Sequence, residues 1–441
     1  MKKLTIYAAL IAAMTFAACG DDTTTVDDGI QDSVKTVDAN MTEISGYLRG
    51  SLMAGKTYYM VGDVIIPENE TLKVEPGVTV IAQGDGSGVG PEFTVNGTFA
   101  AIGTKTQPIL FTVPEADRKI ENIFAGLWNG FQARPTAKAL VLKWCKVEYV
   151  GGQGGAASPR AGKSTYGFAC LAPETEVIVE DCHFRGSVDD MFRPNGGKIN
   201  IVRNVFEFAG ETGGDGLNIK GGTIGNIAFN LFVGGATNAY KVSNEGSSTV
   251  QTNINVYNNI AINCGFRRSG NTRGTNINYE VGARGYAFNN IVANCKRGMR
   301  ALEDADLQNI KFDHNLYYAA YDEMIAEKIP TDAIASTEAV LGSNNIMGNA
   351  GENDPMWSNV NLLEFTWDDF NAGSTQKSGI NEKGNRDFRL KTGSPCIGKG
   401  TTQWGPVQVQ WNVTGDLAPS IMQPSMDIGA YPTDNSGNQY F

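Results

Sequence analysis

Charged and amide side chains recur at matching places in five short segments between residues 189 and 304. These segments read DDMFRP (189–194), GDGLNIKGG (214–222), TNAYKVSN (237–244), TNINYEVG (275–282) and KRGMRALED (296–304). Successive side chains of a β-strand point to opposite faces. If Phe192, Leu217, Tyr240, Ile277 and Met299 point inward, the residues that follow them point outward, and these are Arg193, Asn218, Lys241, Asn278 and Arg300. Stacked strands would therefore line cations and amides along one wall.

A cluster of basic residues occupies the same part of the chain. Between Asn263 and Arg300 seven basic residues face Glu280 alone, a local balance of +6 in a chain of net charge −11: Arg267, Arg268, Arg273, Arg284, Lys296, Arg297 and Arg300. Guanidinium groups bind planar carboxylates and sulfates with two hydrogen bonds, and one-sign clusters are unfavourable without a ligand. We expect an anionic glycan here, bound through Arg267, Arg268, Arg273 and Arg297. Charged loops that only keep the protein soluble are the alternative.

Short β-runs must position these residues. From about Ala139 to Tyr318 the chain repeats a short β-run, an Asn or Asp, a few apolar residues and a Gly-rich turn, at intervals of roughly 22 to 32 residues. Such intervals are too short for a βαβ unit at each step, and helical periodicity is lacking. With 53 Gly, 38 Asn and only two His, the chain is not typical of a helical bundle or of a His-based site. We expect a coil of parallel strands wound around its own core.

Asparagine is concentrated in this repeat, with 21 of the 121 residues from Asn195 to Asn315. Asn tolerates left-handed turn positions, and a buried amide needs hydrogen-bond partners, which a matching Asn one coil away would supply. The candidate members of this ladder are Asp181, Asn204, Asn230, Asn259, Asn290 and Asn315. We expect these six residues to be structural.

Two pairs of cysteines also recur at matching coil positions. Cys145 matches Cys182, and Cys264 matches Cys295. Neighbouring strands lie about 4.8 Å apart, which disulfide geometry could accept. Buried free thiols are the interpretation that we favour.

The repeat resembles that of right-handed parallel β-helix proteins over residues 46 to 432. GDVIIPENETLKVEPGVTVIAQ resembles their opening coils, and DFRLKTGSPCIGKG with DIGAY resembles their last coils. The resemblance implies an all-β fold, a single-stranded right-handed parallel β-helix (solenoid) over residues 46–320. Residues 321–441 would hold a short helical excursion, the final coils and an irregular C-terminal cap. Four tryptophans of the C-terminal part are expected to serve in capping, with stacking on sugar rings as the alternative: Trp357, Trp367, Trp404 and Trp411.

The wall also resembles that of pectate lyases of polysaccharide lyase family nine. In that family a DDGxD-like turn supplies calcium carboxylates, and a GNGFK-like run in the next coil supplies a lysine base. The resemblance implies a Ca²⁺ site at Asp189, Asp190 and Asp215, beside a lysine that abstracts the C5 proton of a uronate before β-elimination. This chain departs from the pattern, because Arg193 replaces a carboxylate and Asn218 replaces the lysine.

These departures leave other residues for catalysis. Lys220 follows Asn218 by two residues and Lys241 lies one coil on, and both are candidate bases. Like charges and burial would favour the neutral form of Lys241, and Arg300 would help to neutralise the uronate carboxylate. Arg193 and Asn218 would bind substrate. The alternative is that Lys241 is a solvated surface lysine.

The N-terminus is typical of a targeting segment. Lys2 and Lys3 precede an apolar run that ends at Ala18, and this run is too short to span a bilayer. TFAAC resembles a bacterial lipoprotein signal, which implies a signal peptide at 1–18, lipidation of Cys19 and an acidic flexible tether at 19–45. The acidic pair after Cys19 resembles the surface-export signal of Bacteroidota lipoproteins. It implies an outer-membrane protein, lipid-anchored and facing the cell exterior, with a periplasm-facing lipoprotein as the alternative.

Three functions fit this sequence. Without residues 1–18 the net charge is −13, which argues against nucleic-acid binding. The first hypothesis is a surface lipoprotein that engages an acidic polysaccharide along the wall from Asp189 to Arg300 and cleaves it as a uronate lyase. A noncatalytic glycan-binding or adhesive protein is the second. The third is a structural part of an outer-membrane protein complex.

Overall fold

The computed structural model describes residues 33–171, 173–270, 273–372 and 379–440. The chain divides into two units, Met1–Ser33 and Val34–Phe441, and every described strand belongs to the second. The expected signal peptide, Cys19 and the first part of the expected tether lie outside the described residues. β1 (Lys35–Thr36) and the start of β2 (Glu43–Leu52) fall within the range 19–45. None of the described helices is long and apolar enough to cross a membrane.

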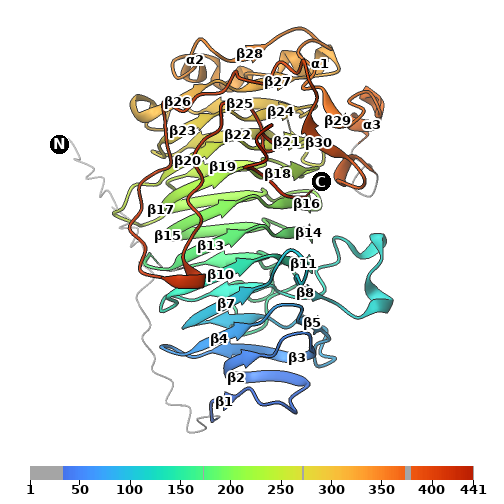
Figure 1. Ribbon diagram of the computed structural model, residues 1–441, viewed down its shortest axis with the longest axis vertical. Helices are drawn as coiled ribbons and strands as arrows, with labels where there is room; N and C mark the ends of the chain where they lie inside the picture. Colours follow the sequence, from blue (N-terminus) through green and yellow to red (C-terminus); the bar gives the residue numbers. More distant parts are fainter. Residues whose placement is uncertain (1–32, 172, 271–272, 373–378, 441) are drawn as a thin grey trace, which may run out of the picture. The chain divides into compact units, whose positions relative to one another are not determined.

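The second unit is a solenoid-like all-β fold in which strands pair in parallel with those one coil away (Figure 1). Three columns of strands result. The first contains β3 (Thr57–Ile66), β5 (Thr79–Ala82), β8 (Ile109–Thr112), β11 (Cys145–Val150), β14 (His183–Ser187), β16 (Val205–Ala209), β18 (Leu231–Val233), β21 (Ile260–Ile262), β24 (Ile291–Ala293), β27 (Leu316–Tyr318) and β28 (Ile346–Met347). The second contains β3 again, β6 (Phe93–Val95), β9 (Phe131–Ala133), β12 (Phe168–Cys170), β15 (Phe192–Val202), β17 (Leu217–Ala228), β19 (Tyr240–Ser243), β22 (Thr275–Glu280) and β25 (Arg297–Ala301). The third contains β2, β4 (Thr71–Val74), β7 (Thr98–Ile102), β10 (Ala139–Lys143), β13 (Glu176–Glu180), the later parts of β15 and β17, β20 (Asn253–Tyr257), β23 (Gly285–Phe288) and β26 (Ile310–Asp313).

Alternating apolar side chains of these strands fill the core. In the second column the rings of Phe168 and Phe192 stack with centroids 4.5 Å apart. The residues predicted to point inward are all fully buried, which confirms that prediction: Phe192, Leu217, Tyr240, Ile277 and Met299. Close packing of apolar side chains over consecutive coils supplies the hydrophobic stabilisation that no single coil could.

A ladder of asparagines borders the first column. The N–H of Asn204 donates to Oδ1 of Asn230 at 2.9 Å, and the N–H of Asn230 donates to Oδ1 of Asn259 at 2.9 Å. The same bond continues through Asn290, Asn315 and Asn345. Each amide nitrogen from Asn204 to Asn315 also donates to a backbone carbonyl: Val179, Ile201, Ile227, Val256 and Ala287. The five predicted asparagines are confirmed, and Asn345 is an additional member.

The prediction was wrong for Asp181. The N–H of the next residue, Cys182, donates to Oδ1 of Asn204 at 2.9 Å, whereas the Asp181 carboxylate pairs with Arg203 at 2.6 Å. Asp181 has a φ of 53°, and positive φ recurs just before the other ladder positions, at Trp144, Arg203, Phe229, Asn258, Asn289 and His314. The residue in the left-handed turn and the residue in the ladder are thus neighbours in the chain. Asp181 occupies the turn position, and Cys182 occupies the ladder position.

The cysteines stack as free thiols, as predicted. The N–H of Cys145 contacts Sγ of Cys182 at 3.4 Å, and the N–H of Cys264 contacts Sγ of Cys295 at 3.5 Å. All six cysteines of the described residues are buried thiols that form no disulfide. Cys145 and Cys182 extend the asparagine ladder, because sulfur accepts the same backbone N–H there.

The excursion at residues 321–341 adjoins the end of the second column. It contains α1 (Asp322–Ala326), η4 (Thr331–Ala333) and α2 (Ile334–Glu338). The N–H groups of Gly298 and Met299 donate to the carbonyls of Glu327 and Lys328 at 3.0 and 3.1 Å. Other elements outside the columns are η1 (Glu115–Asp117), η2 (Ile120–Asn122), η3 (Leu307–Asn309), α3 (Trp367–Asn371), η6 (Gly379–Asn381), η7 (Gly415–Leu417) and the antiparallel pair β29 (Trp357–Asn359) and β30 (Asp387–Leu390).

Residues 401–422, which we call the strap, run across the outside of the third column (Figure 1, red). Asn226 exchanges two hydrogen bonds with Val407, at 2.7 and 3.1 Å. Farther along, Glu180 accepts from the N–H of Ser420 at 2.6 Å. Trp404 and Trp411 belong to the strap and pack on the side of the solenoid. The expectation that they cap an end of the core was therefore wrong.

Candidate functional site

The polar column predicted from the sequence lies in register on the second column of strands. Asn218 pairs with Lys241, Lys241 with Asn278, and Asn278 with Arg300. Arg193 follows Phe192, whose strand partner is Leu217, the residue before Asn218. Because the apolar neighbours fill the core, these five side chains leave the opposite face of the strands.

Within the described residues, much of this wall is covered rather than open. Asn218, Asn278 and Arg300 are 4%, 0% and 7% exposed. What remains is a cavity of about 160 Å³ lined by Asp190, Gly214, Asp215, Thr237, Asn238, Lys241, Arg268, Arg273, Gly274 and Arg300. We call it the cationic cavity. Six residues predicted for the site meet here: Lys241, Arg300, Arg268, Arg273, Asp190 and Asp215.

Asp190 lies at the back of the cationic cavity and is 2% exposed. Its Oδ2 accepts from Arg193 Nη1 at 2.7 Å and from Asn218 Nδ2 at 2.8 Å. Burial, and then the negative charge of Asp215, raise the pKa of Asp190 to about 6. Arg193 and Asn218 therefore support a carboxylate from behind and do not line the cavity.

Lys241 has two carboxylates as neighbours. Its Nζ lies 3.0 Å from Glu280 Oε1 and 4.0 Å from Asp215 Oδ2. Asn278 Nδ2 donates to the other oxygen of Glu280 at 2.9 Å, which holds that carboxylate in place. The charged groups that Lys241 contacts are therefore carboxylates, and not the like charges expected from the sequence. The reason is that Glu280, two residues after Asn278 on β22, points to it.

The three aspartates proposed for calcium do not provide a calcium site. Asp189 Oδ2 pairs with Arg160 at 3.2 Å, and Asp190 pairs with Arg193 at 2.7 Å. Among the described residues no group of three or more His, Cys, Asp or Glu side chains could hold a metal ion. Guanidinium groups pair with Asp189 and Asp190, and Lys241 Nζ lies 4.0 Å from Asp215 Oδ2. Calcium needs free carboxylate oxygens, so this donor set does not fit the ion.

Arg267 anchors a loop instead of facing a ligand. Its guanidinium donates to the carbonyls of Glu211, Gly234, Ala209 and Gly210 at 2.9, 2.7, 2.9 and 2.6 Å. A further bond reaches Asn381 Oδ1 at 2.5 Å. Burial lowers the pKa of Arg267 to about 9. The expected substrate-binding role does not match this geometry, because the protein itself takes up its donors.

Arg297 and Arg300 bind the excursion. Arg297 pairs with Glu327 and Asp332, at 2.8 Å each, and is 1% exposed. Arg300 pairs with Asp332 at 2.9 Å and donates from Nε to Asn278 Oδ1 at 2.7 Å. Arg300 still lines the cationic cavity, whereas Arg297 does not. Lys220 also lies outside the lining and forms an ion pair with Glu245.

Arg268 and Arg273 are the two cations of the cavity that have no partner among the described residues. Their guanidinium groups make no hydrogen bond or ion pair with any other described residue, and both line the cavity. The backbone at Arg268 and Gly270 is fixed, because Lys296 Nζ donates to their carbonyls at 3.0 and 3.3 Å. A cavity with two unpaired guanidinium groups beside Lys241 and Arg300 can bind a carboxylate or a sulfate.

Several contributors to the site were not predicted from the sequence. Thr237 donates to Asp215 Oδ1 at 2.5 Å and lines the cavity. Tyr166 packs under two guanidinium groups, with Arg160 at 4.0 Å and Arg193 at 4.8 Å from its ring centre. Thr237 stands beside Asn238 in TNAYKVSN, and an alignment of hydroxyl residues at the turns could have found it. Tyr166 precedes β12 in a stretch that has no strand pattern, so no local signal marked it.

A comparison of the chain with protein-family models, curated proteins and solved structures finds no match. The fold and the site alone therefore define the class: an all-β, parallel, solenoid-like protein with a cationic cavity on one column of strands.

Proposed function

We propose that this protein binds an acidic polysaccharide by receiving one anionic group in the cationic cavity. The observation that carries this proposal is the pair of unpaired guanidinium groups, Arg268 and Arg273, beside Lys241 and Arg300. Arg268 and Arg273 have no carboxylate partner among the described residues, and an anionic ligand would relieve the repulsion between these cations. Guanidinium forks match carboxylate and sulfate geometry.

The size of the cavity limits what enters it. At about 160 Å³ it is smaller than the roughly 300 Å³ at which pockets for drug-sized ligands begin. One acidic sugar residue or a chain end is a better match than a length of polymer. The rest of the glycan would lie outside, past the partly exposed Lys241.

β-Elimination is the second candidate function. It is favoured by one observation, that Lys241, Arg300 and a carboxyl group with its pKa raised to about 6 line the same cavity. A base at Lys241 would take the C5 proton of a uronate, a double bond would form between C4 and C5, and the C4–O bond would break as the leaving oxygen gains a proton. Lys241 Nζ already pairs with Glu280 at 3.0 Å, so binding alone is the function that the geometry supports better.

The finer fold and the location are also part of our proposal. The columns of parallel strands are compatible with a single-stranded right-handed parallel β-helix of the pectate-lyase type. The sequence signals favour lipidation of Cys19 and attachment to the outer membrane, facing the exterior. An outer-membrane protein complex would be a further partner.

One experiment tests binding and cleavage together. The purified protein is incubated with polygalacturonate and with dextran sulfate, with calcium or with a chelator, while calorimetry follows binding and ultraviolet absorbance follows unsaturated chain ends. Saturable binding that is independent of calcium, without absorbance, is the expected result. Absorbance on polygalacturonate that is lost in Lys241→Ala would establish elimination instead. The proposal would be refuted if the protein bound neither polygalacturonate nor dextran sulfate.

A further inference from the structure

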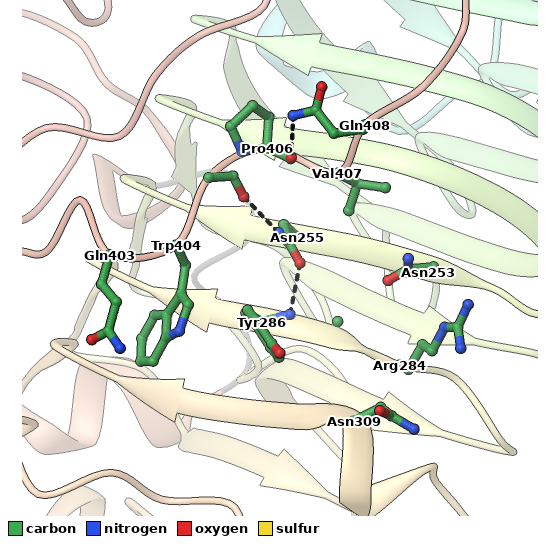
Figure 2. A pocket seen from close by; sticks show the side chains of 12 residues that line it. Asn253, Asn255, Arg284, Tyr286, Asn309, Gln403, Trp404, Pro406, Val407 and Gln408 are labelled. Atoms are coloured by element: carbon green, nitrogen blue, oxygen red, sulfur yellow. Dashed lines mark hydrogen bonds between the residues drawn. The ribbon is translucent and has the colours of Figure 1, made fainter.

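A second cavity lies between the strap and the third column of strands. Its volume is about 520 Å³, within the roughly 300–1,000 Å³ range of small-molecule sites. None of its residues lines the cationic cavity. They are Asn253, Asn255, Arg284, Gly285, Tyr286, Asn309, Gln403, Trp404, Gly405, Pro406, Val407 and Gln408 (Figure 2). We call it the strap cavity.

Hydrogen bonds to the strap hold this cavity open in a defined shape. Asn255 bridges its two sides, because Nδ2 donates to the carbonyl of Gly405 at 2.8 Å and Oδ1 accepts from the N–H of Tyr286 at 2.8 Å (Figure 2). Val407 is fixed in turn by Asn226. A site that is formed before its ligand arrives loses less entropy on binding.

An aromatic surface forms one side of the strap cavity. The ring centres of Trp404 and Tyr286 are 5.5 Å apart, and those of Trp404 and Phe288 are 5.6 Å apart. Trp404 and Tyr286 are half-buried and line the cavity, whereas Phe288 is buried beneath them. Flat, partly exposed rings with a polar edge suit a ligand that is apolar on one face and polar at its rim.

Polar groups without protein partners lie around this aromatic surface. The side-chain amides of Asn253 and Gln403 make no hydrogen bond with any described residue. Nε of Arg284 is buried and also lacks a partner. Buried donors are normally satisfied, so an unpaired Nε at a cavity wall indicates a missing acceptor. In Figure 2 Gln403 and Trp404 lie on one side of Asn255, and Asn253 and Arg284 lie on the other.

The charge of the lining distinguishes this cavity from the cationic one. Arg284 is its single charged residue, and amides supply most of the polar atoms. Each amide offers donors and an acceptor together, which matches hydroxyl groups because they also donate and accept. A carboxylate or sulfate, which only accepts, would leave the amide oxygens unpaired.

We propose that the strap cavity is a binding site for a neutral oligosaccharide, with a sugar ring on Trp404 and Tyr286 and its hydroxyls on Asn253, Gln403 and Arg284. The site is independent of the anionic ligand proposed above. The protein then carries two glycan sites of different charge on two columns of the same solenoid.

The test is calorimetric titration of the whole protein with cellohexaose, xylohexaose, mannohexaose and a galactan hexamer. At least one neutral hexamer is expected to bind saturably. Trp404→Ala should weaken that binding by tenfold or more, and Asn253→Ala by severalfold. Trp411→Phe is the matched control, because Trp411 belongs to the same strap but lies outside the cavity, and it should leave the affinity unchanged.

Asn253→Ala protects the test against misfolding of the Trp404 variant, because that amide bonds to no described residue. The proposal is overturned if none of the four hexamers binds at millimolar concentration. It is equally overturned if a hexamer binds but neither Trp404→Ala nor Asn253→Ala changes its affinity.

Discussion

Lys296 Nζ donates a hydrogen bond to the backbone carbonyl of Arg268 at 3.0 Å. This bond joins the turn before β25 to the loop that carries the unpaired guanidinium groups. Arg267, one residue earlier, fixes the same loop from its other side by donating to Gly234 and Ala209. Two cations thus hold the backbone while Arg268 and Arg273 remain available, a division that favours a preorganised site.

Removal of the Lys296 ammonium should weaken anion binding without unfolding the protein. In Lys296→Met the loop loses two hydrogen bonds, and affinity for dextran sulfate should fall about threefold to tenfold, in line with a contribution of about 1 kcal/mol for a hydrogen bond. Calorimetry measures this change. Lys146→Met, an exposed charge-matched control, should bind as the parent does. Lys296→Arg should restore binding, and equal losses in both Met variants would show that only overall charge matters.

Substitutions of the neighbouring residues Arg267 and Arg268 should affect the stability of the protein differently. Arg267→Met removes four hydrogen bonds to backbone carbonyls, three of them buried. It should lower the free energy of unfolding by about 3 kcal/mol or more, since bonds to charged groups are worth about 1.5–3 kcal/mol. Arg268→Met should change that free energy by about 0.5 kcal/mol or less. Chemical denaturation of both variants measures the difference. Similar stability of the two would contradict the anchoring role of Arg267.

Anion binding should strengthen as the pH falls through about 6. Burial and Asp215 raise the pKa of Asp190 from its ordinary value of 3.8 to about 6, so Asp190 becomes neutral in the folded protein below that pH. Loss of this negative charge should improve the free energy of anion binding by about 1 kcal/mol. Dextran sulfate is the suitable probe because sulfate does not titrate here. Asp190→Asn should bind tightly at pH 7 and show no such rise, and a flat profile in the parent would refute the prediction.

The raised pKa of Asp190 also contributes to the free energy of unfolding. Between about pH 4 and 6 the folded protein binds a proton at Asp190 that the unfolded chain does not. This contribution therefore favours the folded state at low pH and is lost as the pH rises through this window. Denaturation curves at pH 5 and pH 7 measure this contribution to the free energy of unfolding. It should be present in the parent and absent in Asp190→Asn.

Loss of one amide should destabilise the asparagine ladder. In Asn259→Ala the N–H and the amide of Asn230 both lose their acceptor, and buried unpaired groups cost about 1–3 kcal/mol each. Thermal unfolding should shift downward by several degrees, whereas Asn40→Ala, at an exposed position, should not move it. A ladder that tolerates Asn259→Ala would mean that strand packing alone fixes the register.

Local periodicity made the columns predictable from the sequence. The alternation that buries Tyr240 and exposes Lys241 to the other face is a property of adjacent residues, and the repeat of Asn230 and Asn259 follows from stacking. The partners of each arginine were not predictable in this way. Arg297 is neutralised by Asp332, 35 residues later, in a segment with no strand repeat, and no spacing rule connects the two.

The position of the loop that carries Arg268 and Arg273 was not predictable for the same reason. Arg268 and Arg273 belong to a loop whose course depends on contacts of Arg267 with Ala209 and Gly210, 57 to 58 residues earlier. The sequence therefore places the cations correctly in the chain but does not distinguish the arginine that anchors the loop from those that face a ligand.

The double variant Arg268→Gln with Arg273→Gln tests the central claim most directly. Calorimetric titration with a galacturonate oligomer and with a sulfated oligosaccharide, at pH 6 and low salt, should show binding by the parent and by Lys146→Gln. Each guanidinium should contribute about 1.5 kcal/mol or more, so the double variant should bind at least a hundredfold more weakly while unfolding at the same temperature. Equal affinity of the parent and the double variant would contradict the assignment of the cationic cavity as the anion site.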